Sequence, residues 1–174
     1  DTSGSMFSYA WERVLREVEN VLSIYPEVKG VQVLNGDAQY MFSSYRGRWI
    51  PDTPARRKAI MHNLRGWHRF DPSNPVKGIV TAIRTFYSPD KKISLYIFGD
   101  DFKGGSTDEV IDTVDRINRE DAQGNRLVRI HAVGFPVVVQ ADPSQQASGL
   151  RFANLMRELT HRNGGTFVGL NDYR

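Results

Sequence analysis

The chain has 174 residues, of which 40% are hydrophobic and 25% are charged, as expected of a globular protein long enough to bury one core. It contains no cysteine, which excludes disulfide frameworks, thiolate metal sites and cysteine nucleophiles. The formal net charge is only +3, and no apolar run approaches the roughly 20 residues of a membrane span. We therefore expect neither a nucleic-acid partner nor membrane insertion.

The first part of the chain alternates between helical and strand patterns. Apolar residues at helical spacing over residues 11–22 predict an amphipathic helix that ends near Pro26. Residues 28–34 and 39–42 have strand character and are separated by an Asn-Gly-Asp turn signal. This pattern predicts a hairpin that follows the first helix.

Helix starts and an apolar run mark the middle of the chain. Thr53 followed by Pro54 predicts the N-cap and first residue of a second helix, and Asn74 followed by Pro75 predicts another helix start. Residues 93–98 form a nearly continuous apolar run, which is typical of a strand covered on both faces.

The last part continues the alternation. A capping box at residues 106–109 predicts a further helix, and residues 127–134 predict a second core strand. We expect a surface loop over residues 136–148, a last helix with its apolar stripe over residues 152–159, and a short final strand at residues 166–168.

Strands that alternate with helices predict right-handed crossovers and a parallel sheet. We therefore expect an α/β fold with a doubly wound, mostly parallel sheet and helices on both faces. The hairpin after Leu34 predicts one antiparallel edge strand. Ligands of such sheets bind beyond the carboxyl ends of the strands, so polar residues at these ends are the candidates for function.

Three polar clusters fall at such positions. They are Asp-Thr-Ser-Gly-Ser at residues 1–5, Ser-Asn-Pro at residues 73–75, and Asp100-Asp101 after the strand that ends at Phe98. They offer carboxylates and hydroxyls without His or Cys, and such oxygen ligands suit Mg²⁺ or Mn²⁺ before Zn²⁺. Two carboxylates with several neutral hydroxyls would leave the ion electrophilic, so that it seeks an outside anion to complete its octahedron.

The sequence Asp-Thr-Ser-Gly-Ser at residues 1–5 matches the DxSxS signature of the von Willebrand factor type A domain, which is also the fold of the integrin inserted domain. The resemblance covers essentially the whole chain. A helix follows the signature, a hydroxyl residue precedes a later helix, an Asp follows a core strand, and residues 128–135 and 164–168 look like the closing strands of the family. The resemblance implies a metal-ion-dependent adhesion site.

Carried over by position, the resemblance implies a set of ligands for Mg²⁺, with Mn²⁺ or Ca²⁺ as alternatives. Ser3 and Ser5 would bind through their hydroxyls, and Asp1 and Asp100 would be acidic ligands, directly or through water. Ser73 would stand where the family usually has Thr. No residue is implied to be catalytic.

The chain departs from the family pattern in two further ways. Gly-Asp-Asp-Phe at residues 99–102 replaces the usual Thr-Asp-Gly type of sequence, so Asp101 competes with Asp100 as the ligand, and we favour Asp100. The apolar strand that should precede Asp1 and lie centrally in the sheet is absent. We therefore expect residues 1–174 to be a single von Willebrand factor A-like domain that lacks its first strand and belongs to a longer polypeptide.

The residues alone also allow a simpler interpretation, in which the three serines only cap helices and Asp100 only ends its strand. The resemblance instead implies a non-catalytic adhesion or scaffold module, in which an Asp or Glu of a protein partner completes the coordination of the ion. Two alternatives stay open: an interaction domain with an empty site, and a metal-dependent phosphoester hydrolase that uses Asp1 and Asp100. The compartment is undetermined, and the resemblance favours an extracytoplasmic one.

Overall fold

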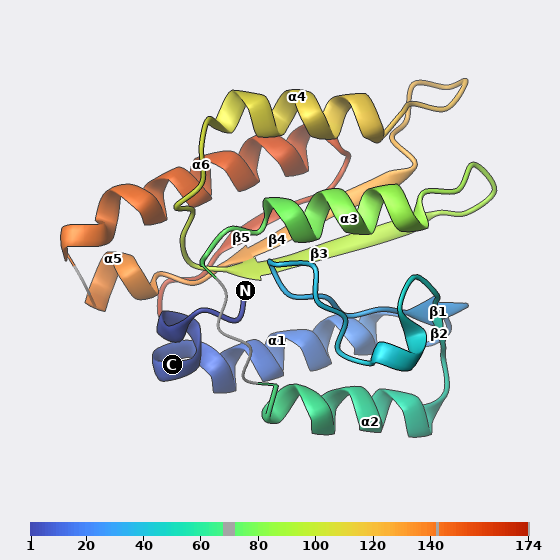
Figure 1. Ribbon diagram of the computed structural model, residues 1–174, viewed down its shortest axis with the longest axis horizontal. Coiled ribbons are helices and arrows are strands. Elements are labelled where there is room, and N and C mark those ends of the chain that lie inside the picture. Colours follow the sequence, from blue (N-terminus) through green and yellow to red (C-terminus); the bar gives the residue numbers. More distant parts are fainter. Residues whose placement is uncertain (68–71, 142, 174) are drawn as a thin grey trace.

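The computed structural model describes residues 1–67, 72–141 and 143–173 of the chain. Helices and strands alternate along it, which confirms the predicted α/β class (Figure 1). The helical segments, in chain order, are a π-helical turn at Met6–Ala10, α1 at Trp11–Ile24, a 3₁₀ turn at Ser43–Tyr45, α2 at Pro54–Arg65, α3 at Val76–Phe86, α4 at Thr107–Ile117, α5 at Val137–Ala141, a 3₁₀ turn at Pro143–Gln145, and α6 at Gln146–Arg162.

A parallel sheet of three strands forms the centre of the fold. Its strands are β3 at Ile93–Gly99, β4 at Val128–Gly134 and β5 at Phe167–Gly169, in the order β3-β4-β5. β3 and β4 pair over their whole length, so Gly99 lies beside Gly134 at the carboxyl end. These strands lie close to the ranges that the apolar runs predicted.

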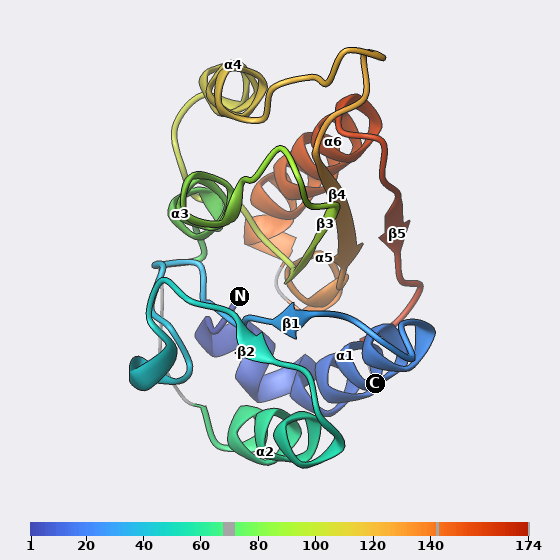
Figure 2. The same ribbon diagram turned by 90° about the vertical axis from the view of Figure 1, so that its right-hand side faces the viewer.

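The antiparallel strand does not lie at the edge of this sheet, so that part of the prediction is wrong. β1 at Gly30–Val31 pairs with β2 at Ile50–Pro51 in a separate two-stranded sheet. The predicted hairpin is reduced to one bridge between Leu34 and Tyr40. In both views β1 and β2 lie on the α1 and α2 side of β3 (Figures 1 and 2). Of the predicted strand at residues 28–34, the structure forms β1 at Gly30–Val31. In the described structure, β2 is the one strand with which β1 pairs.

Two hydrophobic cores hold the helices against the strands. The larger core joins α3, α4 and α6 to β3 and β4, and includes Ile83, Ile130 and Leu155. The smaller core joins α1 and α2, through Trp11 and Leu64, to the segment that follows β4. The helices are thus divided between two cores.

Local signals in the sequence predict the helix ends well. The hydroxyl of Thr53 accepts a hydrogen bond from the backbone nitrogen of Arg56 at 3.2 Å, and that of Ser106 accepts one from Glu109 at 3.4 Å. The prediction of a surface loop at residues 136–148 is wrong, because α5 and the start of α6 occupy most of it. Of the helices in the described part of the chain, none has the length and apolarity needed to cross a bilayer.

Candidate metal centre

The N-terminal segment meets the carboxyl end of β3 (Figure 1). The backbone nitrogen of Asp1 donates to the carbonyl oxygen of Phe98 at 2.8 Å. A Cβ atom added to Gly99 would lie only 3.3 Å from Cβ of Asp1, which shows how closely the two segments approach. The structure therefore brings together the first and third of the polar clusters, as expected of residues at the carboxyl end of a parallel strand.

Ser3 and Ser5 form a hydroxyl pair at this point. Their Oγ atoms lie 3.1 Å apart, and Oδ1 of Asp1 accepts a hydrogen bond from the backbone nitrogen of Ser3 at 2.7 Å. Ser5 precedes the π-helical turn but makes no side-chain capping hydrogen bond. The interpretation of Ser5 as a helix cap is therefore wrong, and its hydroxyl faces Ser3 instead.

The Asp100 side chain is 2% exposed, and its two carboxylate oxygens have no well-formed hydrogen bond within the described structure. Burial, together with the neighbouring charge of Asp101, raises the pKa of Asp100 from its ordinary value of 3.8 to about 6, although a hydrogen bond from the Ser5 hydroxyl acts to lower it. A buried carboxylate without well-formed hydrogen bonds is unfavourable unless a cation or a proton satisfies it.

Asp101 has different surroundings, although it is fully buried. Nζ of Lys103 lies 3.2 Å from Oδ2 of Asp101. Burial raises the pKa of the Asp101 carboxyl, while Lys103 and the Ser148 hydroxyl act to lower it. The carboxylate oxygens of both aspartates lack a well-formed hydrogen bond in the described structure, but Asp101 has Lys103 as a counter-charge, whereas Asp100 lies beside the Ser5 hydroxyl.

Ser73 lies on the Lys103 side of the site. Its carbonyl oxygen accepts a hydrogen bond from the backbone nitrogen of Lys103 at 3.2 Å, and the residue is buried. Its φ of 51° is in the left-handed region, which costs energy for a residue with a side chain and is commonest at functional sites. Oδ1 of Asn74 accepts from the backbone nitrogen of Val76 at 3.1 Å, but α3 begins at Val76 with Pro75 as its N-cap, one residue later than predicted.

Two residues that the sequence did not single out support the loops of the site. Nδ2 of Asn35 donates to the hydroxyl of Thr2 at 3.4 Å, so the turn after β1 holds the N-terminal segment. The carbonyl of Ser148 accepts from the backbone nitrogen of Phe102 at 3.3 Å. The turn signal at Asn35 indicates a change of chain direction but not this contact, and Ser148 lies in the segment predicted as a loop.

The donor set fits a hard divalent cation. Carboxylate and hydroxyl oxygens are the ligands that Mg²⁺, Mn²⁺ and Ca²⁺ prefer, and the buried oxygens of Asp100 lack other partners that would satisfy them. Within the described ranges, no group of three or more His, Cys, Asp or Glu side chains is placed to hold a metal. A cation at this site would therefore depend on the hydroxyls of Ser3 and Ser5.

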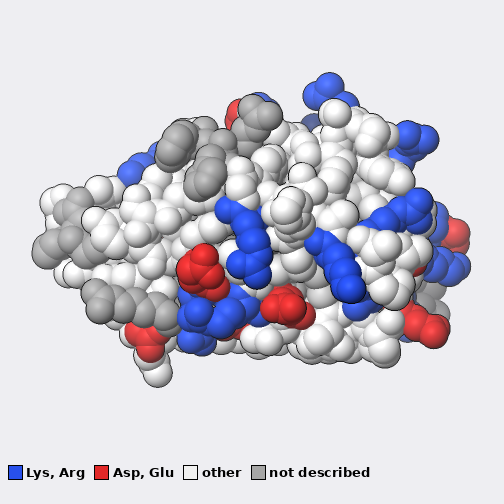
Figure 3. Space-filling view, turned by 90° about the horizontal axis from the view of Figure 1, so that it is seen from below, with Lys and Arg blue, Asp and Glu red and all other residues white. Residues whose placement is uncertain are grey.

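Arg56, Arg57 and Lys58 form a basic cluster near the start of α2. The Arg57 guanidinium binds the Asp52 carboxylate at 2.6 and 2.7 Å and donates to the carbonyl oxygens of Leu22 and Tyr25 at the end of α1. Arg57 therefore fixes the end of α1. Figure 3 shows the lower face of the molecule, where basic side chains are interspersed with acidic ones. Mixed charge of this kind does not favour nucleic-acid binding.

Comparison of the chain with protein-family models, with curated proteins and with solved structures gives no match. The resemblance to the von Willebrand factor A family therefore rests on the motif residues of the sequence.

The pKa of Asp100 leads to a prediction about stability. Because the folded protein holds this proton up to about pH 6 while the unfolded chain releases it near 3.8, the charged carboxylate destabilises the fold at neutral pH, and this cost disappears as the pH falls below 4. Asp100→Asn should therefore raise the Tm of the metal-free protein at neutral pH by about 3 °C or more. Thermal melts in chelator from about pH 4 to pH 8 measure the difference, which should shrink towards the acid end.

Asp112→Asn, on the exposed side of α4, is the matched control and should leave the Tm unchanged. An Asp100→Asn variant that is less stable than the wild type at neutral pH would contradict the assignment of Asp100 as an unsatisfied buried charge.

Proposed function

We propose that this chain is a von Willebrand factor A-like, non-catalytic protein-binding domain that holds Mg²⁺, or Mn²⁺ or Ca²⁺, at the carboxyl end of β3. The proposed ligands are Asp1, Ser3, Ser5, Ser73 and Asp100. The observation that carries the proposal is the Asp100 carboxylate, which is buried beside the Ser5 hydroxyl of the Ser3–Ser5 pair and has no well-formed hydrogen bond within the described structure.

The arrangement of the elements supports the doubly wound layout of that family. The strands run in the order β3-β4-β5, and α4 and α6 connect them in turn and pack in the same core. α1 packs in the other core, as expected when the chain winds in both directions from a central strand. The candidate site then lies where ligands of such folds bind.

Each proposed ligand contributes a defined property. Asp100 gives a charged oxygen in a water-poor position, while Ser3 and Ser5 give neutral oxygens that leave part of the charge of a dication unbalanced. When bound, such an ion would supply an electrophilic position for one more oxygen. Asp1 and Ser5 keep partial exposure, so a partner side chain can approach from their side. An Asp or Glu of a protein partner is the anionic donor that suits this position.

A binding role is favoured over the phosphoester hydrolase. Hydrolysis needs a nucleophile with a general base within hydrogen-bond reach. The described side chains next to Asp100 include the Ser5 hydroxyl and the Asp101 carboxylate, which is already paired with Lys103. These groups suit the binding of a cation better than the transfer of protons during turnover.

The metal proposal predicts a single binding site whose affinity depends on the serine pair. Titration calorimetry should show binding of Mg²⁺ and Mn²⁺ to the wild type, and Asp100→Ala or Ser5→Ala should weaken it by about tenfold or more because each removes a ligand oxygen. Asp112→Ala and Ser8→Ala change exposed residues of the same types and should have no effect. Equal affinities in all five proteins, each shown to be folded by its thermal melt, would contradict the proposed site.

The partner proposal predicts that a carboxylate reaches the metal-loaded site. With Mn²⁺ bound, the short peptide Gly-Asp-Gly should lower the relaxation enhancement of water protons because its carboxylate replaces bound water, whereas Gly-Asn-Gly should not. Both peptides are blocked at their ends, so that the side chain is the one difference in charge. The same response to both peptides would contradict recognition through an acidic side chain.

A further inference from the structure

A lysine side chain reaches into the candidate metal centre, although an ammonium group cannot bind a cation. Nζ of Lys103 lies 3.2 Å from Oδ2 of Asp101, whose side chain is fully buried. Asp101 precedes Lys103 by two residues and follows Asp100 directly, and burial together with the charge of Asp101 raises the pKa of the Asp100 carboxyl. The two carboxylates therefore interact, and the positive charge of Lys103 acts on both.

The loop that carries Lys103 is held in place by backbone contacts. The backbone nitrogen of Lys103 donates to the carbonyl oxygen of Ser73 at 3.2 Å, and the Arg151 guanidinium donates to the carbonyl oxygen of Gly104 at 3.1 Å. A Cβ atom added to Gly104 would lie 2.2 Å from the ring of Phe102, so the turn is closely packed. These contacts do not use the Lys103 side chain, which is 51% exposed. A change of this side chain therefore alters the charge of the site and leaves its loops in place.

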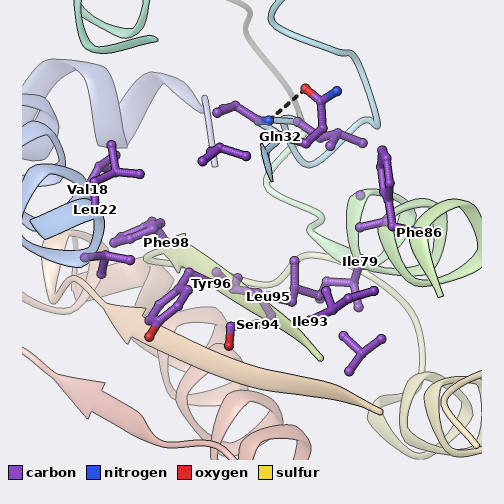
Figure 4. A pocket seen from close by; sticks show the side chains of 18 of the residues that line it. Val18, Leu22, Gln32, Ile79, Phe86, Ile93, Ser94, Leu95, Tyr96 and Phe98 are labelled. Atoms are coloured by element: carbon purple, nitrogen blue, oxygen red, sulfur yellow. Dashed lines mark hydrogen bonds between the residues drawn. The ribbon is translucent and has the colours of Figure 1, made fainter. Parts of the chain in front are cut away.

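Apolar side chains lie on the β3 side of the site. A mostly apolar pocket of about 760 Å³ runs along β3, and Asp1 contributes to its lining. Figure 4 shows Phe98, two residues before Asp100, next to Val18 and Leu22 of α1 in the wall of this pocket. Charges beside apolar groups interact more strongly than charges in open water. The balance between the acidic side chains and Lys103 therefore affects every ion that binds at this end of β3.

The side-chain charges of the site balance a divalent cation when Lys103 is counted. Asp1, Asp100 and Asp101 contribute three negative charges, and Lys103 contributes one positive charge. The net side-chain charge of −2 is the charge that one divalent cation neutralises. Without Lys103 the loaded site would keep one negative charge, which would repel the carboxylate of a partner.

We propose that Lys103 determines the specificity of the candidate metal centre by offsetting the charge of Asp101. Its ammonium group repels the divalent cation that the acidic side chains attract, and it attracts the carboxylate that binds to the loaded ion. Lys103 is thus a specificity-determining residue that weakens cation binding and strengthens the binding of an anionic partner. The inference rests on the proposed function and adds a further residue to the same site.

The test measures two affinities in each protein at low ionic strength, where a half-exposed charge is least screened. Titration calorimetry gives the affinity for Mn²⁺. The relaxation of water protons gives the affinity of the Mn²⁺-loaded protein for the end-blocked peptide Gly-Asp-Gly. Lys103→Gln removes the charge and Lys103→Arg keeps it, while Lys58→Gln changes an exposed lysine of α2 and is the matched control.

Lys103→Gln should bind Mn²⁺ about fivefold more tightly and the peptide about fivefold more weakly than the wild type, because the loss of one positive charge has opposite effects on a cation and an anion. Lys103→Arg and Lys58→Gln should match the wild type in both affinities. A lysine that only stabilises the loop would change both affinities in the same direction, or neither.

A second pair of proteins keeps the test decisive if Lys103→Gln does not fold. Asp101→Asn removes the buried charge that Lys103 balances, so adding Lys103→Gln to it leaves no unpaired carboxylate at residue 101. The double variant should bind Mn²⁺ more tightly and the peptide more weakly than Asp101→Asn alone, and both affinities should lie close to those of the wild type. In chelator, Lys103→Gln should lower the Tm of the wild type but not that of Asp101→Asn.

Affinities for Mn²⁺ and peptide that change in the same direction, or not at all, would overturn the inference and leave the metal centre itself in place. Weaker peptide binding with an unchanged Mn²⁺ affinity would also overturn it, and would show that Lys103 contacts the peptide without acting on the ion. A wild type that binds no Mn²⁺ would contradict the proposed function, and this inference with it.

Discussion

The pairing of β3 with β4 is the constraint on which the rest of the structure depends. Their register runs without interruption from Ile93 and Val128 to Gly99 and Gly134, so it fixes the point at which the chain leaves the sheet. Gly99 lies at that point, and a Cβ atom there would be 3.0 Å from the ring of Phe152 in α6, so a larger residue would force this ring to move. The pairing therefore determines where the next two residues, both aspartates, are placed.

These two aspartates are neighbours in sequence with different electrostatic surroundings. Asp101 lies beside a lysine and a serine of α6, whereas Asp100 lies beside Ser5 of the N-terminal segment. The buried charge of Asp100 and the left-handed backbone of Ser73 lie in loops at the same end of the fold. Two hydrophobic cores stabilise the rest of the protein. Energetically unfavourable features that lie together in one part of a stable fold are typical of a functional site.

The sequence predicts features that depend on neighbouring residues. The caps at Thr53 and Ser106 follow from their own helices, and β3 follows from a continuous apolar run.

The sequence does not predict features that depend on residues far away in the chain. Asn118 and Asn163 form a buried pair at 2.7 Å that joins the ends of α4 and α6, and neither has a local signal. The sequence overestimates the length of the strand at residues 28–34, because the length of a strand depends on the strands that pair with its edges. It does not predict α5, because Val137 is buried in the smaller core by residues that are distant in the chain.

In the candidate site, too, the sequence predicts some features and leaves others open. That Asp1, the two serines and Asp100 come together was predictable, because the carboxyl ends of parallel strands define where ligands bind. The competition between Asp100 and Asp101 could not be decided from the sequence, because it depends on the contacts of Lys103. The position of Ser73 depends on the loop conformation that joins it to Lys103, which no periodic pattern encodes.

The central claim is that the carboxylate of Asp100, together with Asp1 and the serine pair, binds a divalent cation. Carbon-detected NMR of the aspartate carboxyl groups during addition of small amounts of Mn²⁺ tests it most directly, because a paramagnetic ion broadens the signals of its own ligands first. The account predicts early loss of the Asp100 and Asp1 signals and recovery on addition of excess Mg²⁺, with Asp112 unaffected. Uniform broadening of all exposed aspartates, with the Asp100 signal retained, would contradict it.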